Sequence, residues 1–231
     1  MRKALVTGGT RGIGLSCVEI LTNRGFDVYY TGRSKPIDSF GGFLKADFST
    51  REGISDFCSK ISEIKIDVLV NNAGVNNPKP LSDIDFPDID WAFNINVIAP
   101  LNITKTVVPH MIDNNWGRVI NIGSILGEIS REFRSIYSIT KSGLVGMTRA
   151  HSAEFAKFGV LVNCVAPGYL DTDLTRKNLG PLGMQEISKQ IPVGHLGSPR
   201  DIAEIVSYLA SESSSFITGQ VFTVDGGYLG V

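Results

Sequence analysis

The amino-acid sequence predicts an α/β protein built on one doubly wound parallel sheet with helices on both faces. First, short apolar runs alternate with helix-like segments from one end of the 231 residues to the other. Second, a glycine-rich turn, residues 8–14, joins the first apolar run to the first helix-like segment. Third, no repeat, linker or low-complexity segment divides the chain, so residues 1–231 are expected to form a single domain.

Short apolar runs bounded by glycine, proline or polar residues predict the strands. Strands that alternate with helices are joined by right-handed crossovers, which places them side by side in one parallel sheet. Ligands of such sheets bind at the carboxyl ends of the strands, so the residues that follow each strand are the candidates for a site. The predicted strands span residues 3–7, 27–31, 42–46, 66–70, 117–123, 160–166 and 220–224.

Helical periodicity accounts for most of the chain between these strands. Ser135 is a candidate N-cap for the helix that follows it, and Ser198 with Pro199 marks the start of the last helix. The predicted helices run from the glycine-rich turn to about residue 24, over 50–63, over 91–113, from Ser135 onward, and over 199–213.

Prolines and glycines predict irregular structure in three places. Pro100 and Pro109 interrupt the helix expected over 91–113, so a kink or a broken end is expected there. Residues 75–90 are polar and proline-bearing, and are expected to form a loop with a short helix. Residues 169–197 are predicted to be a long loop that acts as a lid or a binding loop.

Composition excludes several classes of function. Apolar residues make up 42% of the chain, which fits a soluble globular protein, and the net charge of −1 gives no large basic surface for nucleic acid. No run approaches the roughly 20 apolar residues of a membrane span, and no signal peptide precedes the first strand, so a cytoplasmic location is expected. Cys17, Cys58 and Cys164 have neither metal-ligand spacing nor a disulfide pattern, so no metal site is expected.

The turn at residues 8–14 reads Gly-Gly-Thr-Arg-Gly-Ile-Gly and lies between a strand and a helix. Glycines allow the backbone to approach a pyrophosphate closely, and a helix N-terminus offers free N–H groups and a positive dipole. A plain tight turn would also use glycines, but the strand before and the helix after favour a phosphate-binding loop.

The end of the second strand bears on the choice of nucleotide. Folds that bind NAD often carry an acidic residue about 20 positions after the glycines, where it holds the ribose 2′-hydroxyl. Here the strand ends at Arg33, and the nearby acid, Asp27, stands at the opposite end of the strand. Arg33 together with Arg11 suits a 2′-phosphate instead, which predicts NADP(H) rather than NAD(H).

Ser124, Tyr137 and Lys141 are the candidate catalytic residues. Tyr137 and Lys141 are four residues apart, so they share one face of the predicted helix. An ammonium group favours the phenolate and lowers the pKa of a tyrosine from about 10 toward the range useful for proton transfer. Ser124 follows a strand and could hydrogen-bond the same substrate oxygen. Tyrosine and lysine at this spacing also occur as ordinary surface pairs, so the pair alone does not establish catalysis.

With these motifs in place, the chain resembles the single-domain form of the short-chain dehydrogenase/reductase family over nearly its whole length. Five motifs in the family's order carry the resemblance, and together they are far more specific than any one of them. They are Thr7 to Gly14, Asn71-Asn72-Ala73-Gly74, Ser124, Tyr137 with Lys141, and Pro167-Gly168 with Thr172.

The resemblance implies a seven-stranded sheet, an oxidoreductase that interconverts a ketone and a secondary alcohol with a nicotinamide cofactor, and a homo-oligomer, often a tetramer. Tyr137 would exchange a proton with the substrate oxygen, Lys141 would bind the nicotinamide ribose, and Ser124 would orient the substrate. Asn96 would hold a water in the proton relay, although Asn94 competes for that role on sequence alone. The implied cofactor-binding residues are Gly8, Thr10, Arg11, Gly12, Ile13, Gly14, Arg33, Asp47, Phe48, Asn72, Ala73, Gly74, Tyr137, Lys141, Pro167, Gly168, Leu170 and Thr172.

Within the family, the chain most resembles the bacterial 3-oxoacyl-[acyl-carrier-protein] reductases, which predicts a carrier-bound carbonyl substrate. Those reductases commonly have basic residues, which help to dock the acidic carrier protein, where this chain has Asn115 and Phe158. A reductase of a sugar or other small alcohol in cell-surface polysaccharide synthesis is therefore an alternative. A nucleotide-binding regulator without catalysis is a third reading, which the intact Ser124, Tyr137 and Lys141 disfavour.

The segment between Ser124 and Tyr137 carries Arg131 and Arg134 and is expected to border the substrate. Because substrate pockets are mostly apolar, two arginines there suggest an anionic feature on the substrate, such as the phosphate of a phosphopantetheine arm or of a nucleotide sugar. The alternative is that both arginines face water or pair with Glu128 and Glu132.

Overall fold

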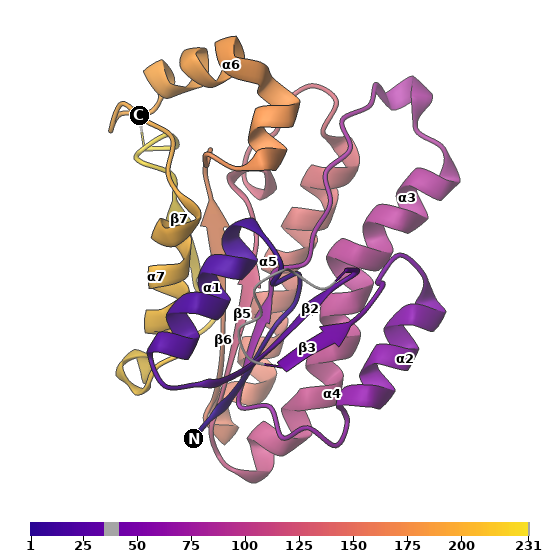
Figure 1. The fold of residues 1–231 in the computed structure, drawn as a ribbon, viewed down its shortest axis with the longest axis vertical. Coiled ribbons are helices and arrows are strands. Elements are labelled where there is room, and N and C mark those ends of the chain that lie inside the picture. The colour runs from indigo at the N-terminus through magenta and orange to yellow at the C-terminus, as the bar shows by residue number, and fades with distance from the viewer. Residues whose placement is uncertain (35–41, 231) are drawn as a thin grey trace.

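The computed structural model describes residues 1–34 and 42–230 and contains one seven-stranded sheet in which all strands are parallel (Figure 1). The strand order is β3-β2-β1-β4-β5-β6-β7, so the chain reverses its direction of growth between β1 and β4. A crevice at such a reversal is where doubly wound sheets bind ligands. The strands are β1 Lys3–Val6, β2 Asp27–Gly32, β3 Gly42–Lys45, β4 Val68–Asn71, β5 Gly117–Ile122, β6 Val160–Pro167 and β7 Val221–Val224.

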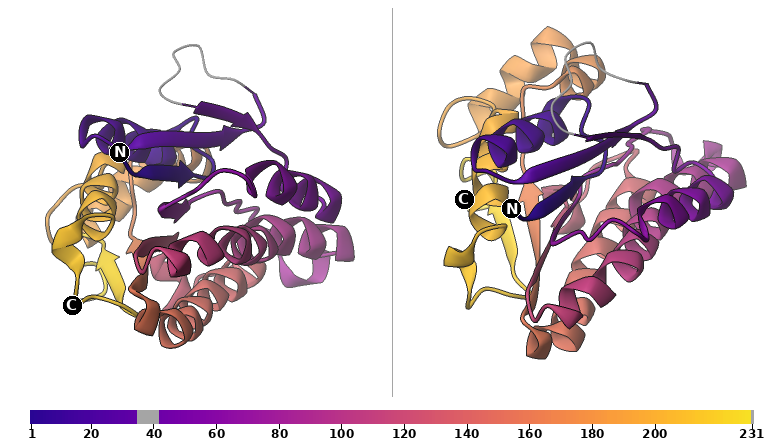
Figure 2. Two further views of the ribbon diagram at one scale, coloured as in Figure 1. Left: turned by 90° about the horizontal axis from the view of Figure 1, so that it is seen from below. Right: turned by 60° about the horizontal axis from the view of Figure 1, so that its bottom comes forward.

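Helices cover both faces of the sheet, which confirms the predicted fold class (Figure 2). On one face α1, Gly12–Asn23, packs beside α7, Pro199–Leu209, over a core that includes buried residues of β1, β4 and β5. On the other face lie α2, Arg51–Ile61, and α4, Ala99–Asp113. The long helix α5, Ser135–Phe155, lies on the same side as α4, because both helices hydrogen-bond side chains of neighbouring strands there.

The helix expected over 91–113 is divided in the structure. The helix α3 spans Phe86–Phe93, a stretch of π-helix follows over Asn94–Ile98, and α4 begins at Ala99. Pro100 lies in the first turn of α4, where a missing N–H has no cost, and the helix continues through Pro109. The expected break at Pro109 is therefore wrong, and the irregularity lies at the asparagines instead.

Two further expectations need correction. Residues 169–197 are not one long loop, because α6 occupies Asp173–Gln190 at the top of the molecule in Figure 1, with a non-helical Gly180 in its middle. The N-cap of α5 is Arg134 rather than Ser135, and Arg134 makes no side-chain cap hydrogen bond. The start of α7 is as predicted, since Ser198 and Asp201 form a reciprocal capping box.

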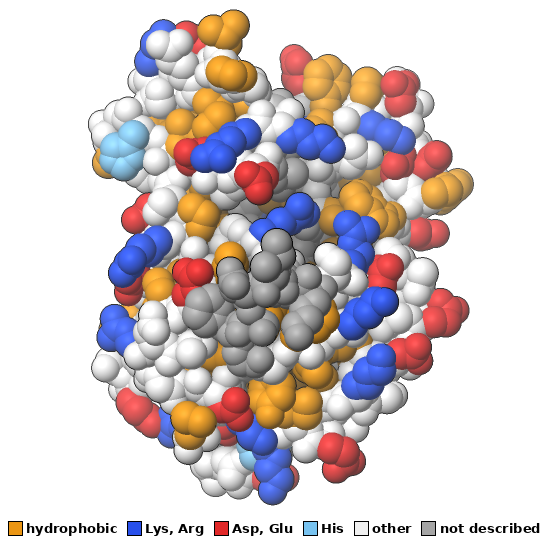
Figure 3. Space-filling model, viewed as in Figure 1, with side chains coloured by type: hydrophobic (Ala, Val, Ile, Leu, Met, Phe, Trp, Pro, Cys, Tyr) orange, Lys and Arg blue, Asp and Glu red, His pale blue; other side chains and the backbone are white. Residues whose placement is uncertain are grey.

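The surface bears charges of both signs. On the face drawn in Figure 3, Lys and Arg side chains are interspersed with Asp and Glu rather than gathered into one basic field. Within residues 1–34 and 42–230, no helix has the length and apolar character needed to cross a membrane. The same part of the chain brings no three His, Cys, Asp or Glu side chains together as a metal would require.

Candidate active site

The glycine-rich loop joins β1 to α1 and leaves open space before the helix. Gly12 has a φ of +53°, and a Cβ built there would meet no atom within 4 Å. Arg11 is the N-cap residue of α1 and makes no side-chain cap hydrogen bond, so it does not satisfy the first N–H groups of the helix. At Gly14 a Cβ would overlap the carbonyl oxygen of Gly8, which explains the glycine there by close packing. Free N–H groups behind an open glycine are what a pyrophosphate requires, so the loop fits a dinucleotide.

Side chains at the ends of β1 and β4 hold this loop in place. The Thr7 hydroxyl accepts hydrogen bonds from the backbone N–H groups of Asn72 and Ala73, at 2.9 and 3.0 Å. The Asn72 amide donates to the carbonyl oxygens of Thr7 and Gly8, at 2.8 and 3.1 Å. Asn72, predicted to contact the cofactor, therefore uses its side chain to brace the loop. Thr7 has a bracing role that the sequence analysis did not assign.

Arg33 follows β2 and Asp47 follows the neighbouring strand β3. The Asp47 carboxylate accepts from the backbone N–H of Ser49 at 2.9 Å, and that bond, helped by the nearby charge of Arg33, lowers the pKa of Asp47. Arg33 and Arg11 are both exposed, so their guanidinium groups are accessible from solvent. A carboxylate and a guanidinium therefore follow the carboxyl ends of two neighbouring strands, which is where such sheets bind ligands.

Three predicted cofactor residues direct their side chains into the core. Phe48 is 6% exposed and packs edge-on against Phe57 at 5.2 Å between ring centres. Leu170 is buried in the core under α1 and α7, and Ile13 packs against the same core. The side chains of Phe48 and Leu170 are therefore taken up by core packing, while that of Ile13 is only partly buried. Thr10 likewise lies against Gly32 of β2.

Ser124, Tyr137 and Lys141 meet beyond the end of β5. Ser124 starts a short turn in which its hydroxyl accepts from the N–H of Leu126 at 3.1 Å. Tyr137 and Lys141 lie on the first turns of α5, with the Lys141 Nζ 5.6 Å from the centre of the Tyr137 ring. The Lys141 ammonium donates to the carbonyl oxygen of Ile122, the last residue of β5, at 2.7 Å. Tyr137 and Lys141 thus share one face of α5, as their spacing suggested, and this face lies at the end of β5 with Ser124.

The titration of this cluster differs from the expectation. Burial raises the pKa of Tyr137, and the groups that oppose the rise are the Ser124 hydroxyl and the Arg134 guanidinium rather than Lys141. Burial lowers the pKa of Lys141 to about 8, because its side chain is only 4% exposed. The Lys141 ammonium lies 5.6 Å from the centre of the Tyr137 ring and donates its hydrogen bond to Ile122 rather than to the phenol.

Asn96 lies in the π-helical stretch and next to this cluster. Its amide nitrogen donates to the carbonyl oxygen of Val75 and to the Thr140 hydroxyl, each at 3.0 Å, and its Oδ1 accepts from the Val75 N–H. A Cβ at Gly74 would lie 3.4 Å from the Lys141 Nζ and 3.5 Å from the Asn96 Oδ1, so all three meet. Asn94 instead donates to the carbonyl oxygen of Ser49, on the side of α2. Of the two asparagines, the structure brings Asn96 to the cluster.

A buried polar network beneath the cluster was not found from the sequence. The Asn71 amide donates to Asn121 Oδ1 at 2.9 Å and to the Thr104 hydroxyl at 3.2 Å. Asn121 in turn donates to the Thr148 hydroxyl of α5 at 2.9 Å. The network ties the ends of β4 and β5 to α4 and α5, and it fixes α5 with its Tyr137 against the sheet. An asparagine within each of two neighbouring apolar strands is the signal that could have revealed it.

The remaining predicted site residues lie at the end of β6 and at the start of α6. Pro167 pairs with Val224, and Gly168 passes so close to Asp225 that a Cβ would approach its Cα to 2.6 Å. Thr172 begins α6, where its hydroxyl accepts from the Thr175 N–H at 3.2 Å. These residues therefore form the connection between β6 and α6, and their contact with the nicotinamide stays a prediction from the family resemblance.

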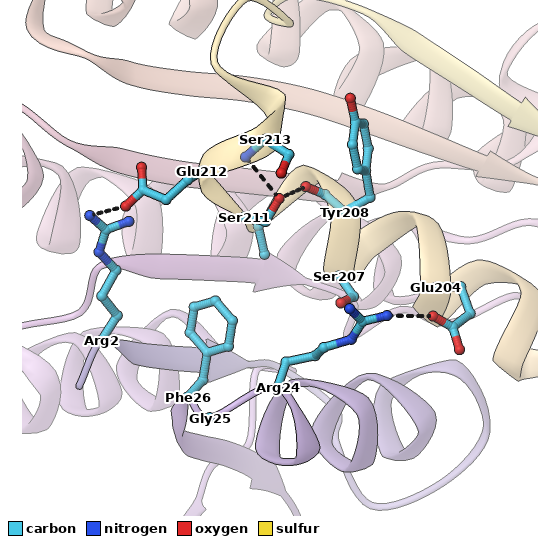
Figure 4. Close-up of a pocket in the computed structure, with 11 residues that line it drawn as sticks. Arg2, Arg24, Gly25, Phe26, Glu204, Ser207, Tyr208, Ser211, Glu212 and Ser213 are labelled. Atoms are coloured by element: carbon cyan, nitrogen blue, oxygen red, sulfur yellow. Dashed lines mark hydrogen bonds and ion pairs between the residues drawn. The ribbon is translucent and has the colours of Figure 1, made fainter.

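A second hollow lies at the opposite end of the sheet (Figure 4). It lies between the start of β1, the end of α1 and the end of α7, and its arginines pair with its acids: Arg2 with Glu212 at 2.5 Å and Arg24 with Glu204 at 3.6 Å. Because its charges are already paired and it is remote from the strand ends that hold Ser124, it is not the candidate active site.

Comparison with known proteins agrees with this geometry. Residues 8–229 match the family model described as enoyl-(acyl carrier protein) reductase. The chain is 36% identical to the 3-oxoacyl-[acyl-carrier-protein] reductase of Aquifex aeolicus, over 97% of this chain and 96% of the relative. The corresponding reductase of Thermotoga maritima is 34% identical over 96% of each chain.

Solved structures are similar over the whole length. One, provisionally named an NAD(P)-dependent gluconate 5-dehydrogenase of Beutenbergia cavernae with NADP bound, has a TM-score of 0.93 and 30% identity, and covers 100% of this chain and 97% of its own. Another, provisionally named a β-ketoacyl-ACP reductase, has a TM-score of 0.89 and 32% identity, with coverages of 99% and 98%. The chain belongs to the short-chain dehydrogenase/reductase family, and it is an oxidoreductase of the class that acts on CH–OH and carbonyl groups.

Proposed function

We propose that the protein reduces a ketone to a secondary alcohol with NADPH, and catalyses the reverse reaction with NADP⁺. The observation that carries this proposal is the meeting of Ser124, Tyr137 and Lys141 at the end of β5, with Lys141 close to Gly74 and the neighbouring Ala73 close to Gly8 of the glycine-rich loop. A site with a proton donor beside an open dinucleotide loop suits transfer of a hydride and a proton to a carbonyl group. A regulator without catalysis would have no need of this cluster.

Each residue of the cluster has one task in the proposal. NADPH, when bound, supplies the hydride that the carbonyl carbon accepts. Tyr137 gives its phenolic proton to the carbonyl oxygen, and the Ser124 hydroxyl holds that oxygen in place. Lys141, whose lowered pKa of about 8 makes it a group that exchanges protons near neutral pH, binds the nicotinamide ribose and returns a proton toward Tyr137. Asn96 positions the water that completes this relay.

The preference for NADP(H) rests on the two exposed arginines at the adenosine end. Arg33 and Arg11 would pair with the 2′-phosphate, and Asp47 beside Arg33 would contact the adenine. Charge-assisted contacts of this kind at an exposed site are worth about 1–3 kcal/mol, or roughly ten- to a hundredfold in selectivity. Similar solved proteins with NADP bound support the same choice.

The first substrate class to test is a 3-oxoacyl thioester carried on acyl carrier protein, because the curated relatives are named for that reaction. Asn115 and Phe158 weigh against tight docking of the carrier, since neither supplies a positive charge. A sugar acid or related small alcohol is the second candidate, and two observations favour it: the likeness to proteins named for gluconate, and the Arg134 guanidinium near Tyr137. A homotetramer in the cytoplasm remains our expectation from the family resemblance.

The test measures loss of NADPH absorbance with a panel of ketones that includes 3-oxoacyl thioesters and keto-sugars. Replacement Tyr137→Phe keeps the ring but removes the proton, and should lower turnover by about 10²–10⁴-fold. Binding of NADPH, followed by fluorescence titration, should survive this change. A Phe variant that keeps most of its activity would remove Tyr137 from the mechanism, and a wild-type protein that reduces no ketone would contradict the proposed reaction.

A further inference from the structure

The segment between Ser124 and Tyr137 contains a backbone conformation that its sequence would not favour. Phe133 has a φ of +63°, which an aromatic residue rarely adopts, and its side chain is 52% exposed. Its carbonyl oxygen accepts from the N–H of Lys79 at 3.2 Å, which ties the segment to the loop after β4. Unfavourable backbone conformations of this kind gather at functional sites. Here the next residue is Arg134, which caps the helix that carries Tyr137.

Arg131 has its interactions satisfied within the protein. Its guanidinium donates to the Tyr228 hydroxyl and, at 3.4 Å, to the Gln190 side chain. It also lies 5.1 Å from the ring centre of Tyr169, which packs edge-on against Tyr228 at 5.3 Å. Arg131 therefore joins the segment to the end of α6 and to the C-terminal residues, and it has a structural explanation that needs no ligand.

Arg134 differs from Arg131 in burial and in partners. It is partly buried, and its Nη1 atom is fully buried with no hydrogen-bond partner in the structure. Among the parts of the chain that are described, no carboxylate lies within 4 Å of it, so the expected pairing with Glu128 or Glu132 is not found. A buried guanidinium N–H without an acceptor is costly, and such a group in a native protein calls for an explanation.

The surroundings of Arg134 point to a ligand of opposite charge. Among the described residues, the groups whose charge acts on its pKa are Arg131, which repels it, and the phenols of Tyr137 and Tyr169, and none of these is a carboxylate. Arg134 is also near enough to Tyr137 for its charge to act on that phenol. Arg134 is the N-cap residue of α5 and Tyr137 lies in the first turn of that helix, so an anion bound by Arg134 would lie near the reacting carbonyl. The phosphate of a phosphopantetheine arm is separated from a 3-oxo group by the whole arm, and could not reach Arg134 while the ketone lies at Tyr137.

We propose that Arg134 binds a carboxylate that the substrate carries a few bonds from its reacting carbonyl, and that the enzyme therefore selects oxo acids over neutral ketones. The proposal rests on the proposed ketone reduction at Tyr137, and it separates the two substrate classes considered above. A guanidinium binds a carboxylate with two parallel hydrogen bonds, which would satisfy the unpaired Nη1 and fix the orientation of the substrate.

The experiment compares each oxo acid with its own methyl ester, so that only the charge changes. The probes are 3-oxobutanoate, 4-oxopentanoate and 5-oxohexanoate, which vary the distance between ketone and carboxylate, together with the N-acetylcysteamine thioester of 3-oxobutanoate. The variants are Arg134→Gln, which removes the charge, and Arg134→Lys, which keeps it. Arg131→Gln is the matched control, because it removes the same charge from the same segment where the guanidinium already has partners.

The wild-type enzyme should show a kcat/KM at least tenfold higher for one acid than for its ester. Arg134→Gln should remove this preference by raising KM for the acid about 10–100-fold while KM for the ester changes little. Arg134→Lys should restore part of the preference, and Arg131→Gln should leave the acid-to-ester ratio unchanged whatever it does to the overall rate. A ratio near one in the wild type, a higher kcat/KM for the thioester than for every acid, or an equal loss on acid and ester in Arg134→Gln would overturn the proposal.

A binding measurement separates failure of this inference from failure of the proposed reaction. In the presence of NADPH, the favoured oxo acid should raise the melting temperature of the wild type and of Arg131→Gln but not that of Arg134→Gln. If no ketone is reduced and this pattern holds, the reaction is wrong and the carboxylate site stands. If the acid stabilises none of the proteins, or all of them equally, the carboxylate site is refuted.

Discussion

Replacement of Lys141 by Met should make the stability of this protein less dependent on pH in the alkaline range. Lys141 is 4% exposed, and burial lowers its pKa from 10.5 to about 8. Between these two values the folded state binds fewer protons at this site than the unfolded state does. Stability therefore rises as the pH increases through the folded pKa toward the unfolded one, and the buried charge lowers stability below about pH 8.

The size of this effect follows from the two pKa values. Between about pH 7.5 and about pH 9.5, the difference in proton binding amounts to about 2 kcal/mol of added stability in the wild type. Methionine fills a similar volume without titrating, so Lys141→Met should lack that gain. The variant also loses the hydrogen bond to Ile122, but that loss is largely the same at both pH values and cancels in the comparison. The Cys164 thiol interacts with Lys141, but burial raises the pKa of that thiol to about 11, so in the folded state it stays protonated at both pH values in both proteins.

Urea unfolding of both proteins at the two pH values, at one protein concentration, gives the four free energies needed. For each protein, the free energy of unfolding at the lower pH is subtracted from that at the higher pH. This change should be about 2 kcal/mol larger in the wild type than in Lys141→Met. Turnover should also fall sharply, because the variant has no group to bind the ribose. A difference close to zero, or one of opposite sign, would show that Lys141 titrates normally and would remove the basis for its role in proton exchange.

Three other replacements test separate parts of the structure. Arg33→Asp should lower the ratio of kcat/KM for NADPH to that for NADH by about 10–100-fold, and an unchanged ratio would take Arg33 out of the cofactor site. Gly14→Ala places a Cβ against the carbonyl oxygen of Gly8, and should weaken NADPH binding more than tenfold in a fluorescence titration. Gly146→Ala is the control, because a Cβ there meets nothing within 4 Å, and this variant should bind NADPH normally. Phe133→Gly relieves an unfavourable φ of +63° and should raise the free energy of unfolding by about 0.5–1 kcal/mol, whereas Asn115→Gly, at a φ of 50° that asparagine tolerates, should change it little.

The fold and the order of its elements could be predicted because they depend on local signals that agree with one another. The start of α7 is an example, since Ser198, Pro199 and Asp201 favour the same boundary and the structure has the expected cap. The glycine-rich loop is another, because the positive φ at Gly8 and Gly12 and the close packing at Gly14 are requirements of the backbone itself. A position with such a requirement can be recognised in the sequence, because it is occupied by glycine.

Elements without a consistent local signal were missed. The helix α6 was predicted as a loop because Gly180 and Pro181 stand in its middle, and the structure shows why both are tolerated: Gly180 has a φ of 62° and divides the element into two helical parts. The π-helix at Asn94–Ile98 was also missed, and the side chain of Asn96 within it bonds to Val75 and Thr140, which are far away in the sequence. Contacts over such separations cannot be read from helical periodicity.

The directions of side chains within the site were the least predictable feature. Arg131 and Arg134 are identical residues three positions apart, and the sequence offers no reason to treat them differently. The left-handed backbone of Phe133 lies between them, so one guanidinium reaches Gln190 and Tyr228 while the other is held near Tyr137 with an unpaired nitrogen. Burial without a partner carries the argument for a substrate carboxylate, and it is a property of the folded chain alone. Residue type and spacing could therefore identify the reaction, while the inference about the substrate depends on the buried, unpartnered Nη1 atom of Arg134.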